Sequence, residues 1–310
     1  MKIIDRLLIY MGLNYIHVPD KLYIKWKYRR IFNKKLNLNN LETFNEKLQW
    51  LKLNNRNPLY TTLVDKYEVR DFIKKRIGEE YLIPLLGVYE KFDDINFDLL
   101  PDKFVIKCNH DSGSVWVCKN KKNFEIEKTK KEVTRALSRN YYYAAREWPY
   151  KNVNPKIIIE KYIEDKNGLL PDYKFYCFNG KCDYVMVCTE RETGTPKFYY
   201  FNKKWDLIKN MSNDGINVKN DFYMPKPKNI EKMFELASSL SKKIPFVRID
   251  FYNVDGNIYF GEFTFYPSGG FDDTRREEAE EIFSNMLGDV HKWKQLDLWQ
   301  AKKKMNIEEQ

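Results

Sequence analysis

The first hundred residues of the chain carry the hydrophobic spacing of amphipathic helices. Between residues 43 and 51 the apolar positions recur at three- and four-residue intervals, which places them on one helix face. They are Phe44, Leu48 and Leu51. Thr43 and Glu46 begin this run as a capping box, in which each side chain accepts a hydrogen bond from the other residue's backbone N–H. A further run over residues 62–77 has the same period and predicts a second helix.

From residue 104 the pattern changes to that of β-strands. Apolar segments at 104–108 and 115–118 flank a turn of small polar residues, and 157–159 is apolar throughout, as buried strands are. Asn179-Gly180 and Asp255-Gly256 each stand between two alternating segments, which is a strong signal for a hairpin. Helical spacing returns between these strands. Helices and antiparallel hairpins in this mixture predict an α+β fold.

Composition narrows the class of protein without indicating a function. The chain has 310 residues and a net charge of +10, and 16% of it is aromatic, which a disordered chain could not bury. Five cysteines form no C-x-x-C pair and there are only three histidines, so we expect free thiols in a reducing cytoplasm rather than a zinc site.

The positive charge gathers in short runs that are typical of solvated helix faces. One run, Lys21–Arg30, also contains Tyr23, Trp26 and Tyr28. Peripheral contact with the inner face of the membrane through this run is left open. No nucleic-acid partner is expected, because base-reading residues do not cluster beside these charges. The oligomeric state is not predicted.

The last hairpin places charged residues on one strand face. Arg248 and Asp250 alternate with apolar residues, and so do Glu262 and Thr264 on the following strand. Two carboxylates, a hydroxyl group and an arginine suit Mg²⁺, which takes a few carboxylates together with phosphate oxygens. The same alternation also occurs on an ordinary solvated sheet face, so both interpretations stay open.

The register of this hairpin tests the magnesium interpretation. A two-residue turn at Asp255-Gly256 pairs Val254 with Asn257, and a regular ladder would then send Asp250 and Glu262 to opposite faces. The two acids share a face only with an odd-length loop or a β-bulge. The three-residue loop Val254–Gly256, with Gly256 left-handed, is the simplest solution. We therefore predict an odd-length loop or a bulge between the two acids.

Two further segments have the residue types of a nucleotide site. Lys107 ends a strand and precedes Asn109–Ser114, so an ammonium group and exposed backbone N–H groups could meet phosphates. A tight hairpin with a surface lysine is the alternative. Glu160 and Glu164 follow the buried strand at 157–159, where they suit either a nucleotide pocket or a salt-bridged rim.

In this order the segments resemble an ATP-grasp enzyme, and more closely the TupA-like ATP-grasp family, which occurs with bacterial surface-polysaccharide genes. The resemblance extends from about residue 37 onward. It rests on Thr43–Trp50, Leu63–Tyr67, Lys107–Ser114, Asp172–Phe175, Phe246–Asp250 and Gly261–Thr264. It implies an α+β ATP-grasp fold in which two α+β subdomains clasp ATP. The implied divisions are a helical N-terminal region at 1–100, a lid subdomain at 101–160, and a subdomain with the metal site at 161–310.

The resemblance implies ATP and Mg²⁺ as cofactors and assigns residues to them. The implied nucleotide-binding residues are Lys107, Asn109, Asp111, Ser112, Gly113, Ser114, Glu160, Lys161, Tyr162, Ile163, Glu164 and Lys174. The implied catalytic residues are Lys107, Lys174 and Arg248, and the implied metal ligands are Asp250, Glu262 and Thr264. Thr264 stands where many relatives carry asparagine.

The implied reaction joins a carboxylate to an amine through an acylphosphate. For this chain the resemblance suggests an amino acid or amine joined to a uronic-acid-type carboxylate, in the cytoplasm, during surface-polysaccharide assembly. Three alternatives remain: a kinase that stops at phosphoryl transfer to a sugar or amino acid, a glycosyltransferase, and a basic nucleic-acid-binding protein. The sequence identifies neither the carboxylate nor the amine.

Overall fold

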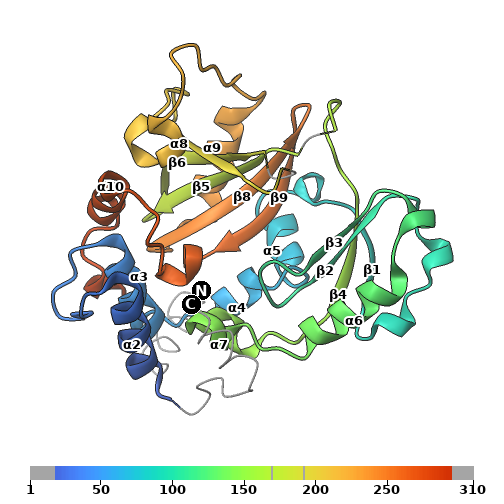
Figure 1. Cartoon of the computed structure of the whole chain (residues 1–310), viewed down its shortest axis with the longest axis horizontal. Coiled ribbons are helices and arrows are strands. Elements are labelled where there is room, and N and C mark those ends of the chain that lie inside the picture. Colours follow the sequence, from blue (N-terminus) through green and yellow to red (C-terminus); the bar gives the residue numbers. More distant parts are fainter. Residues whose placement is uncertain (1–17, 169, 191–192, 295–310) are drawn as a thin grey trace, which may run out of the picture.

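The computed structural model describes residues 18–168, 170–190 and 193–294. Within these ranges, two antiparallel sheets stand on either side of the molecule (Figure 1). The first sheet has the order β1 (Leu85–Tyr89), β4 (Ile157–Lys161), β2 (Phe104–Cys108), β3 (Val115–Cys118). The second has the order β7 (Lys197–Asn202), β6 (Lys181–Thr189), β5 (Asp172–Phe178), β8 (Phe246–Val254), β9 (Asn257–Thr264). The α+β prediction is confirmed.

Helices surround both sheets. They are α2 (Asp20–Phe32), α3 (Phe44–Asn54), α4 (Leu59–Val64), α5 (Val69–Arg76), α6 (Ile126–Leu137), α7 (Tyr142–Ala145), α8 (Asn213–Ile216), α9 (Ile230–Leu240) and α10 (Glu277–Leu287). The capping box of Thr43 and Glu46 is present at the start of α3. The single helix predicted for 62–77 is wrong. Asp65 breaks it, because its Oδ1 accepts the backbone N–H groups of Tyr67 (2.8 Å) and Glu68 (3.2 Å) and so begins α5 separately.

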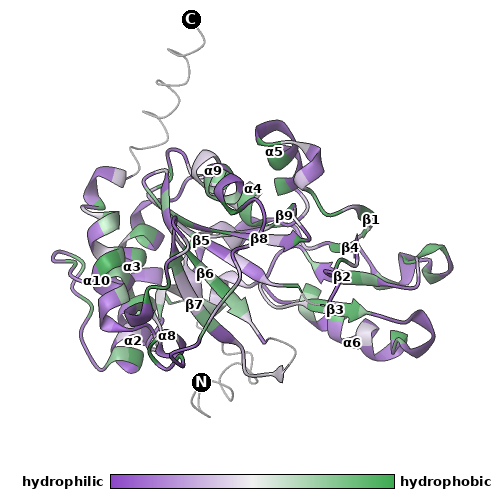
Figure 2. Cartoon of the chain, turned by 90° about the horizontal axis from the view of Figure 1, so that it is seen from above, coloured by the Kyte–Doolittle hydropathy of each residue, from purple (hydrophilic) through white to green (hydrophobic). Residues whose placement is uncertain are grey.

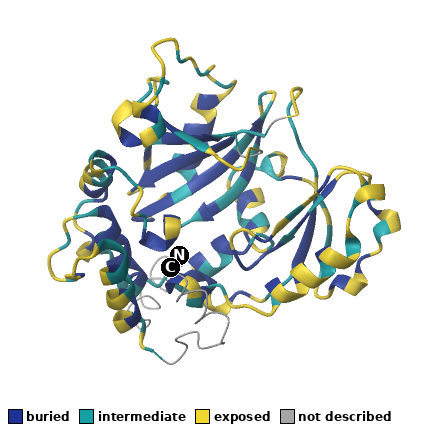
Figure 3. Cartoon of the chain, viewed as in Figure 1, coloured by how far each residue is buried: buried dark blue, intermediate teal, exposed yellow. Residues whose placement is uncertain are grey.

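Each sheet buries one apolar face against helices. In the first sheet Phe104, Ile106 and Ile159 belong to a core that includes Val133 of α6. In the second sheet Phe175 lies edge-on to Phe234 of α9, with ring centroids 4.9 Å apart. Figure 3 shows most of the second sheet's strands as buried and much of α6 as exposed. Figure 2 shows the same division in hydropathy, with hydrophobic residues along β5 and β6.

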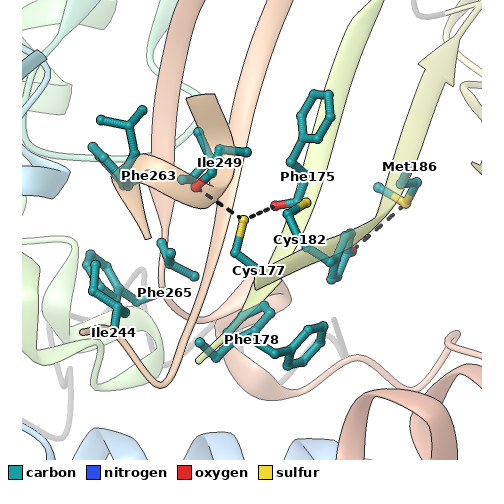
Figure 4. Close-up of a cluster of buried hydrophobic side chains, with 14 of the residues drawn as sticks. Phe175, Cys177, Phe178, Cys182, Met186, Ile244, Ile249, Phe263 and Phe265 are labelled. Atoms are coloured by element: carbon teal, nitrogen blue, oxygen red, sulfur yellow. Dashed lines mark hydrogen bonds between the residues drawn. The ribbon is translucent and has the colours of Figure 1, made fainter. Parts of the chain in front are cut away.

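The five cysteines, all within the described ranges, form no disulfide and are buried, as predicted. Cys177 and Cys182 lie among Phe175, Phe178 and Met186 in the second sheet (Figure 4). The Cys177 thiol donates weakly to the carbonyl of Phe175 at 3.7 Å. These thiols therefore serve as small apolar core residues.

The aromatic and basic run predicted at Lys21–Arg30 lies in α2, which packs against α7. Tyr23 and Tyr28 are buried, and the Tyr23 hydroxyl donates to the Ala144 carbonyl at 3.1 Å. Trp26 remains 38% exposed under the guanidinium of Arg30. Membrane contact through this helix stays a prediction. Within the described ranges, no helix combines the length and the apolar character needed to cross a bilayer.

The β8–β9 hairpin contains the predicted bulge. Val254 pairs with Asn257 across a two-residue turn, Phe251 pairs with Phe260, and Asp250 then pairs with Glu262. Gly261 is the extra residue. The bulge is confirmed and the three-residue loop is wrong, because Asp255 (φ 52°) and Gly256 (φ 101°) both adopt the positive φ of a two-residue hairpin turn.

Glycine at the bulge is required by space. A Cβ on Gly261 would lie 2.9 Å from the carbonyl oxygen of Asp250, which is backbone in the neighbouring strand and cannot turn aside. The bulge therefore needs both the extra residue and the absence of a side chain. Together they return Glu262 to the face that Asp250 occupies.

We predict that Gly261→Ala destabilises the protein by about 2–3 kcal/mol, as overpacking against backbone does. Urea unfolding monitored by tryptophan fluorescence measures the loss. Gly194→Ala is the control, because a Cβ there meets nothing within 4 Å and only its φ of 78° is unfavourable, at about 1 kcal/mol. Equal losses in the two variants would contradict a steric requirement at Gly261.

Candidate active site

One face of the second sheet gathers the charged residues of three strands. Lys174 pairs with Asp250, Asp250 with Glu262, and Arg248 with Thr264. Paired residues point to the same side of a sheet, so all five side chains share this face, which we call the site face. The structure therefore brings Arg248, Asp250, Glu262 and Thr264 together on one face, and Lys174 joins them from β5; their roles stay a prediction.

Asp250 is at the centre of the site face and is 3% exposed. Its Oδ1 accepts from Arg248 Nε at 2.6 Å, and its Oδ2 accepts from Arg248 Nη2 and Lys174 Nζ, both at 2.6 Å. Lys174 also donates to Asp172. Arg248 Nη2 continues to Thr264 Oγ1 at 3.0 Å and Glu262 Oε1 at 3.4 Å. One arginine thus connects all the predicted metal ligands.

Electrostatics keep this network ionised despite its burial. Burial by itself would raise the pKa of Asp250, but the charges of Arg248 and Lys174 outweigh it and lower that pKa. Burial likewise opposes the charge of Lys174, yet Asp250 and Asp172 hold its pKa above the usual value. The face therefore carries fixed charges of both signs.

The donor set fits Mg²⁺ incompletely. Asp250, Glu262 and Thr264 supply hard oxygen atoms on one face, which Mg²⁺ prefers. Among the described residues, no group of three or more His, Cys, Asp or Glu side chains could hold a metal ion by itself. The remaining oxygen ligands would have to come from phosphate and water, as is usual for Mg²⁺.

On the first sheet, Lys107 and Glu160 share the face that turns toward β9. Lys107 Nζ lies 2.6 Å from Glu160 Oε2, and Arg70 of α5 lies 3.2 Å from Glu160 Oε1. A small pocket between the two sheets is lined by these three residues together with Lys66 and Gly261. The bulge thus lies directly beside the Lys107 site.

Two apolar side chains on β3 face the same way as Lys107. Val115 pairs with Lys107, and Val117 pairs with Val105. Val115 is 43% exposed and Val117 is 49% exposed on β3, the edge strand of the first sheet. An open apolar surface beside an ammonium group suits a ligand that has both a flat ring and phosphates.

The loop at 109–114 is fastened by its own polar side chains. Asn109 donates to Asp65 Oδ1 and to the Asn154 carbonyl, both at 2.9 Å, and its Oδ1 accepts the Lys156 N–H at 2.6 Å. Asp111 accepts from the Ser114 hydroxyl. Ser112 and Gly113 are the exposed members of the loop, and Gly113 has a φ of 96°. Ser112 and Gly113 are therefore the members of this loop that can meet a ligand.

The segment after β4 forms a polar rim. Glu164 accepts from Lys103 Nζ at 2.7 Å and from the Tyr162 hydroxyl at 2.9 Å. The Lys161 backbone N–H donates to Pro84 at 2.9 Å, and its side chain is exposed. Ile163 is half-buried beside them. His110 lies behind the loop, with Nε2 3.2 Å from the carbonyls of Ala136 and Arg139.

A cavity of about 320 Å³ opens on the site face. Arg248, Glu262 and Thr264 line one wall, and Ser112 reaches it from the loop of the first sheet. The rest of the lining, which we call the far wall, has Lys27, Glu147, Tyr150, Tyr266 and the turn at Ser268 and Gly269. The cavity therefore joins the exposed loop position to the charged network.

Lys52 of α3 holds the far wall of this cavity together. It is fully buried, and its Nζ donates to the carbonyls of Ala145 (2.8 Å) and Gly269 (2.7 Å), with the ring of Phe271 at 4.3 Å. Burial lowers the pKa of Lys52 well below its usual value, although Glu147 acts in the opposite direction. Burial raises the pKa of Glu147 to about 7, against the charges of Lys52 and Lys27.

With this geometry in view, the family model for TupA-like ATP-grasp proteins matches residues 46–292. The chain belongs to this family. Membership places it among ATP-grasp enzymes of the carboxylate–amine ligase type, and the paired antiparallel sheets are those of an ATP-grasp ligase fold. A comparison with curated protein sequences gives no match.

Solved structures resemble the chain more distantly. The D-alanine–D-alanine ligase of Bacillus anthracis is 17% identical at a TM-score of 0.41, over 73% of this chain and 66% of that chain. The enzyme of Helicobacter pylori is 16% identical at 0.41, over 78% and 68%. The ATP-grasp ligase PsnB with its minimal precursor is 9% identical at 0.42, over 75% and 62%. At these TM-scores the likeness says nothing about what this chain binds.

Several residues of the site were not predicted from the sequence. Lys66 donates to the carbonyl of Asp111 and lies inside the family segment at 63–67, so it could have been found. Arg70, Lys52, Glu147 and Tyr150 carry no local signal, because only the fold brings them to the pockets. Arg191, a candidate carboxylate binder on the basis of its residue type, lies outside the described residues. Arg146 is buried among the rings of Tyr23 and Tyr142.

The network predicts different costs for removing the two acids. Asp250→Asn removes the carboxylate that Arg248 and Lys174 share, leaves them only Glu262 and Asp172 as acidic partners, and should destabilise the protein by about 3 kcal/mol. Glu262→Gln should cost less than about 1 kcal/mol, since the Glu262 side chain is 30% exposed and 3.4 Å from Arg248. Chemical unfolding of both variants without ligands measures the difference. Equal stability of the two would mean that Asp250 does not balance the buried cations.

Glu147 predicts a stability that depends on pH. Its pKa is about 7 in the folded chain and 4.5 in the unfolded one, so the unfolded chain releases this proton first. Wild-type stability should therefore fall as pH rises from 4.5 through 7, by about 3 kcal/mol at 1.36 kcal/mol per unit. Glu147→Gln should remove this loss and melt higher than the wild type at pH 8, with little difference at pH 4.5.

The matched control is Glu235→Gln on the exposed side of α9, which should change stability by less than about 0.5 kcal/mol at either pH. Thermal melts of the three proteins across this range provide the comparison. A Glu147→Gln variant that melts no higher than the wild type at pH 8 would show that the ionised Glu147 carboxylate does not reduce the stability of the folded protein.

Proposed function

We propose that the chain is an ATP-dependent ligase that joins the amino group of an amino acid or amine to a uronic-acid-type carboxylate in bacterial surface-polysaccharide assembly. The family supports the ATP-dependent ligase chemistry. The cavity carries the proposal, since it connects the exposed loop of the first sheet with the arginine and carboxylates of the site face. A ligase must bring ATP and its two substrates together, and this cavity connects the loop proposed to bind the phosphates with the charged site face.

The nucleotide would lie between the two sheets. Lys107 and Lys174 face the gap from opposite sheets, and each is bound to a carboxylate that a phosphate could replace as its partner. The loop around Ser112 and Gly113 would close on the triphosphate. The backbone of 160–163 would line the adenine, and Glu164 would lie toward the ribose. Lys66 and Arg70 add positive charge to this side.

The metal ions would be held by Asp250, Glu262 and Thr264 together with phosphate oxygens, and they would neutralise charge on the migrating phosphoryl group. Arg248 would orient and balance the same charge, because its guanidinium already bridges these three residues. Positioning and charge neutralisation supply most of the catalysis of phosphoryl transfer, so no serine or histidine nucleophile is needed.

The reaction would proceed in two steps. A carboxylate oxygen of the first substrate attacks the γ-phosphorus and releases ADP, which gives an acylphosphate. The amine nitrogen then attacks the acyl carbon, the C–O bond to phosphate breaks, and inorganic phosphate leaves with the electron pair. A kinase would stop after the first transfer, with a hydroxyl group as the acceptor.

We expect ADP release to require both an acid and an amine. The experiment incubates the protein with ATP, Mg²⁺ and a panel of uronic acids and amino acids, singly and in pairs, and measures ADP. Release that depends on a pair supports a ligase. Release with a single hydroxyl acceptor would establish the kinase instead, and no ADP release from any pair would contradict the ligase with these substrates.

We also expect ATP with Mg²⁺ to raise the melting temperature, by the equivalent of about 2.7 kcal/mol at a hundredfold excess over Kd. Lys107→Ala should remove most of this shift, because it deletes the ammonium group that faces the gap between the sheets. Lys130→Ala is the matched control, since Lys130 pairs with Asp93 on the exposed side of α6. A Lys107→Ala variant that ATP stabilises as strongly as the wild type would contradict the phosphate role.

A further inference from the structure

Glu147 is a buried carboxylate that the fold leaves without a partner. It is 4% exposed, and its side chain makes no hydrogen bond or ion pair to any residue within the described ranges. It nevertheless lines the cavity that Arg248 also lines. A carboxylate in this position is costly unless something binds it, because buried charges are normally paired.

The neighbouring cations are held by other groups. Lys52 Nζ is bound to the carbonyls of Ala145 and Gly269. Lys27 Nζ donates to the carbonyl of Ala144 at 2.7 Å. The fold thus brings two lysines near Glu147 and directs these hydrogen bonds to backbone oxygens. The carboxylate is left facing the cavity.

The turn at Gly269 keeps this region of the cavity open. Gly269 has a φ of 65°, and a Cβ there would lie 2.6 Å from the Cβ of Ala145 and 3.6 Å from Glu147 Oε1. A side chain at this position would therefore compete for the space beside the carboxylate. The space at Glu147 depends on a residue that has no side chain.

The ligand that suits this site is a positively charged group with N–H donors. An ammonium group satisfies the carboxylate by charge and by hydrogen bonds. A neutral hydroxyl group would leave the charge uncompensated, and a second carboxylate would be repelled. Lys27 and Arg248 also line the cavity, but both already donate hydrogen bonds to other groups, so the Glu147 carboxylate favours a primary amine in its protonated form.

We propose that Glu147 binds the amino group of the amine substrate and accepts a proton from it as the amide forms. This inference rests on the proposed ligase function, and it identifies Glu147 as the residue that selects the amine nucleophile of that reaction. Glu147 is then a catalytic residue in the same cavity as Arg248, Glu262 and Thr264, where the acylphosphate would form.

The proton balance of the step is complete. The ammonium group gives one proton to Glu147, which leaves a free electron pair on nitrogen to attack the acyl carbon. As the C–O bond to phosphate breaks, the nitrogen loses a second proton, which leaves with phosphate as hydrogenphosphate. Glu147 then returns its proton to water. A carboxyl group whose pKa is near neutrality is suited to this exchange.

The experiment separates amine use from acylphosphate formation. Wild type, Glu147→Gln, Glu147→Asp and the control Glu235→Gln are incubated with ATP, Mg²⁺ and glucuronate. Each receives either hydroxylamine, which is uncharged at neutral pH and traps acylphosphates, or a mixture of the twenty amino acids with ethanolamine. ADP and hydroxamate are measured. Thermal melts with ATP, with and without the amine mixture, report amine binding separately.

We expect Glu147→Gln to keep the hydroxylamine-dependent rate within about twofold and to lose the amine-dependent rate by about a hundredfold or more, with partial recovery in Glu147→Asp. An equal loss of both rates, or no loss of either, would overturn the proposal. A wild type that forms no hydroxamate would contradict ligase activity on glucuronate. The thermal melts then test amine binding at Glu147 independently of that activity. An amine shift in wild type that is absent in Glu147→Gln supports the site, and the absence of any amine shift in wild type overturns it.

Discussion

The carboxylate of Asp250, held between Arg248 and Lys174 in the middle of the second sheet, is the interaction on which the site depends. A buried ionic group is stable only where every partner is present and correctly oriented. The three residues come from β5 and β8, and Arg248 extends the network to Glu262 and Thr264 on β9. The network therefore requires these strands to be in one register. The bulge at Gly261 gives β9 that register, and its lack of a side chain lets the strand lie against the Asp250 carbonyl.

The sequence predicted this region of the molecule because it depends on local rules. Side-chain alternation placed Arg248 with Asp250, and it then required an odd-length loop or a bulge to bring Glu262 to the same face; the structure has the bulge. The same rules failed at 62–77, where an ordinary helical period concealed the turn that the Asp65 side chain makes with the Tyr67 and Glu68 N–H groups. For the loop at 109–114 the residue types were identified, but Asn109 and Asp111 turn inward to fasten the loop. The spacing of residues in a sequence does not distinguish a side chain that binds a ligand from one that only stabilises the ligand-binding loop.

The wall of the cavity that contains Glu147 could not have been found by such rules. Lys52 stands in α3, whose apolar residues recur every three or four positions as in other helices. Its two carbonyl partners lie 93 and 217 residues away along the chain. Nothing near Lys52 in the sequence distinguishes a buried cation from a solvated one. Glu147 likewise belongs to a short irregular segment between Ala145 and Trp148. Its burial is a property of the packed whole, and so is the shift of its pKa.

The lining of the cavity has two parts, and different elements of the fold hold each part in place. Arg248, Glu262 and Thr264 are fixed by the second sheet, while Gly269 and the chain at Ala145, next to Glu147, are fixed to α3 by Lys52. Among the described lining residues, Ser112 is the contribution of the loop that joins β2 and β3. A change in the distance between the sheets would therefore move Ser112 relative to Arg248 while the Lys52 bonds hold the far wall. In the proposed ligase, the first sheet would control where the phosphates meet the cavity, and the helical region would control which nucleophile the cavity accepts.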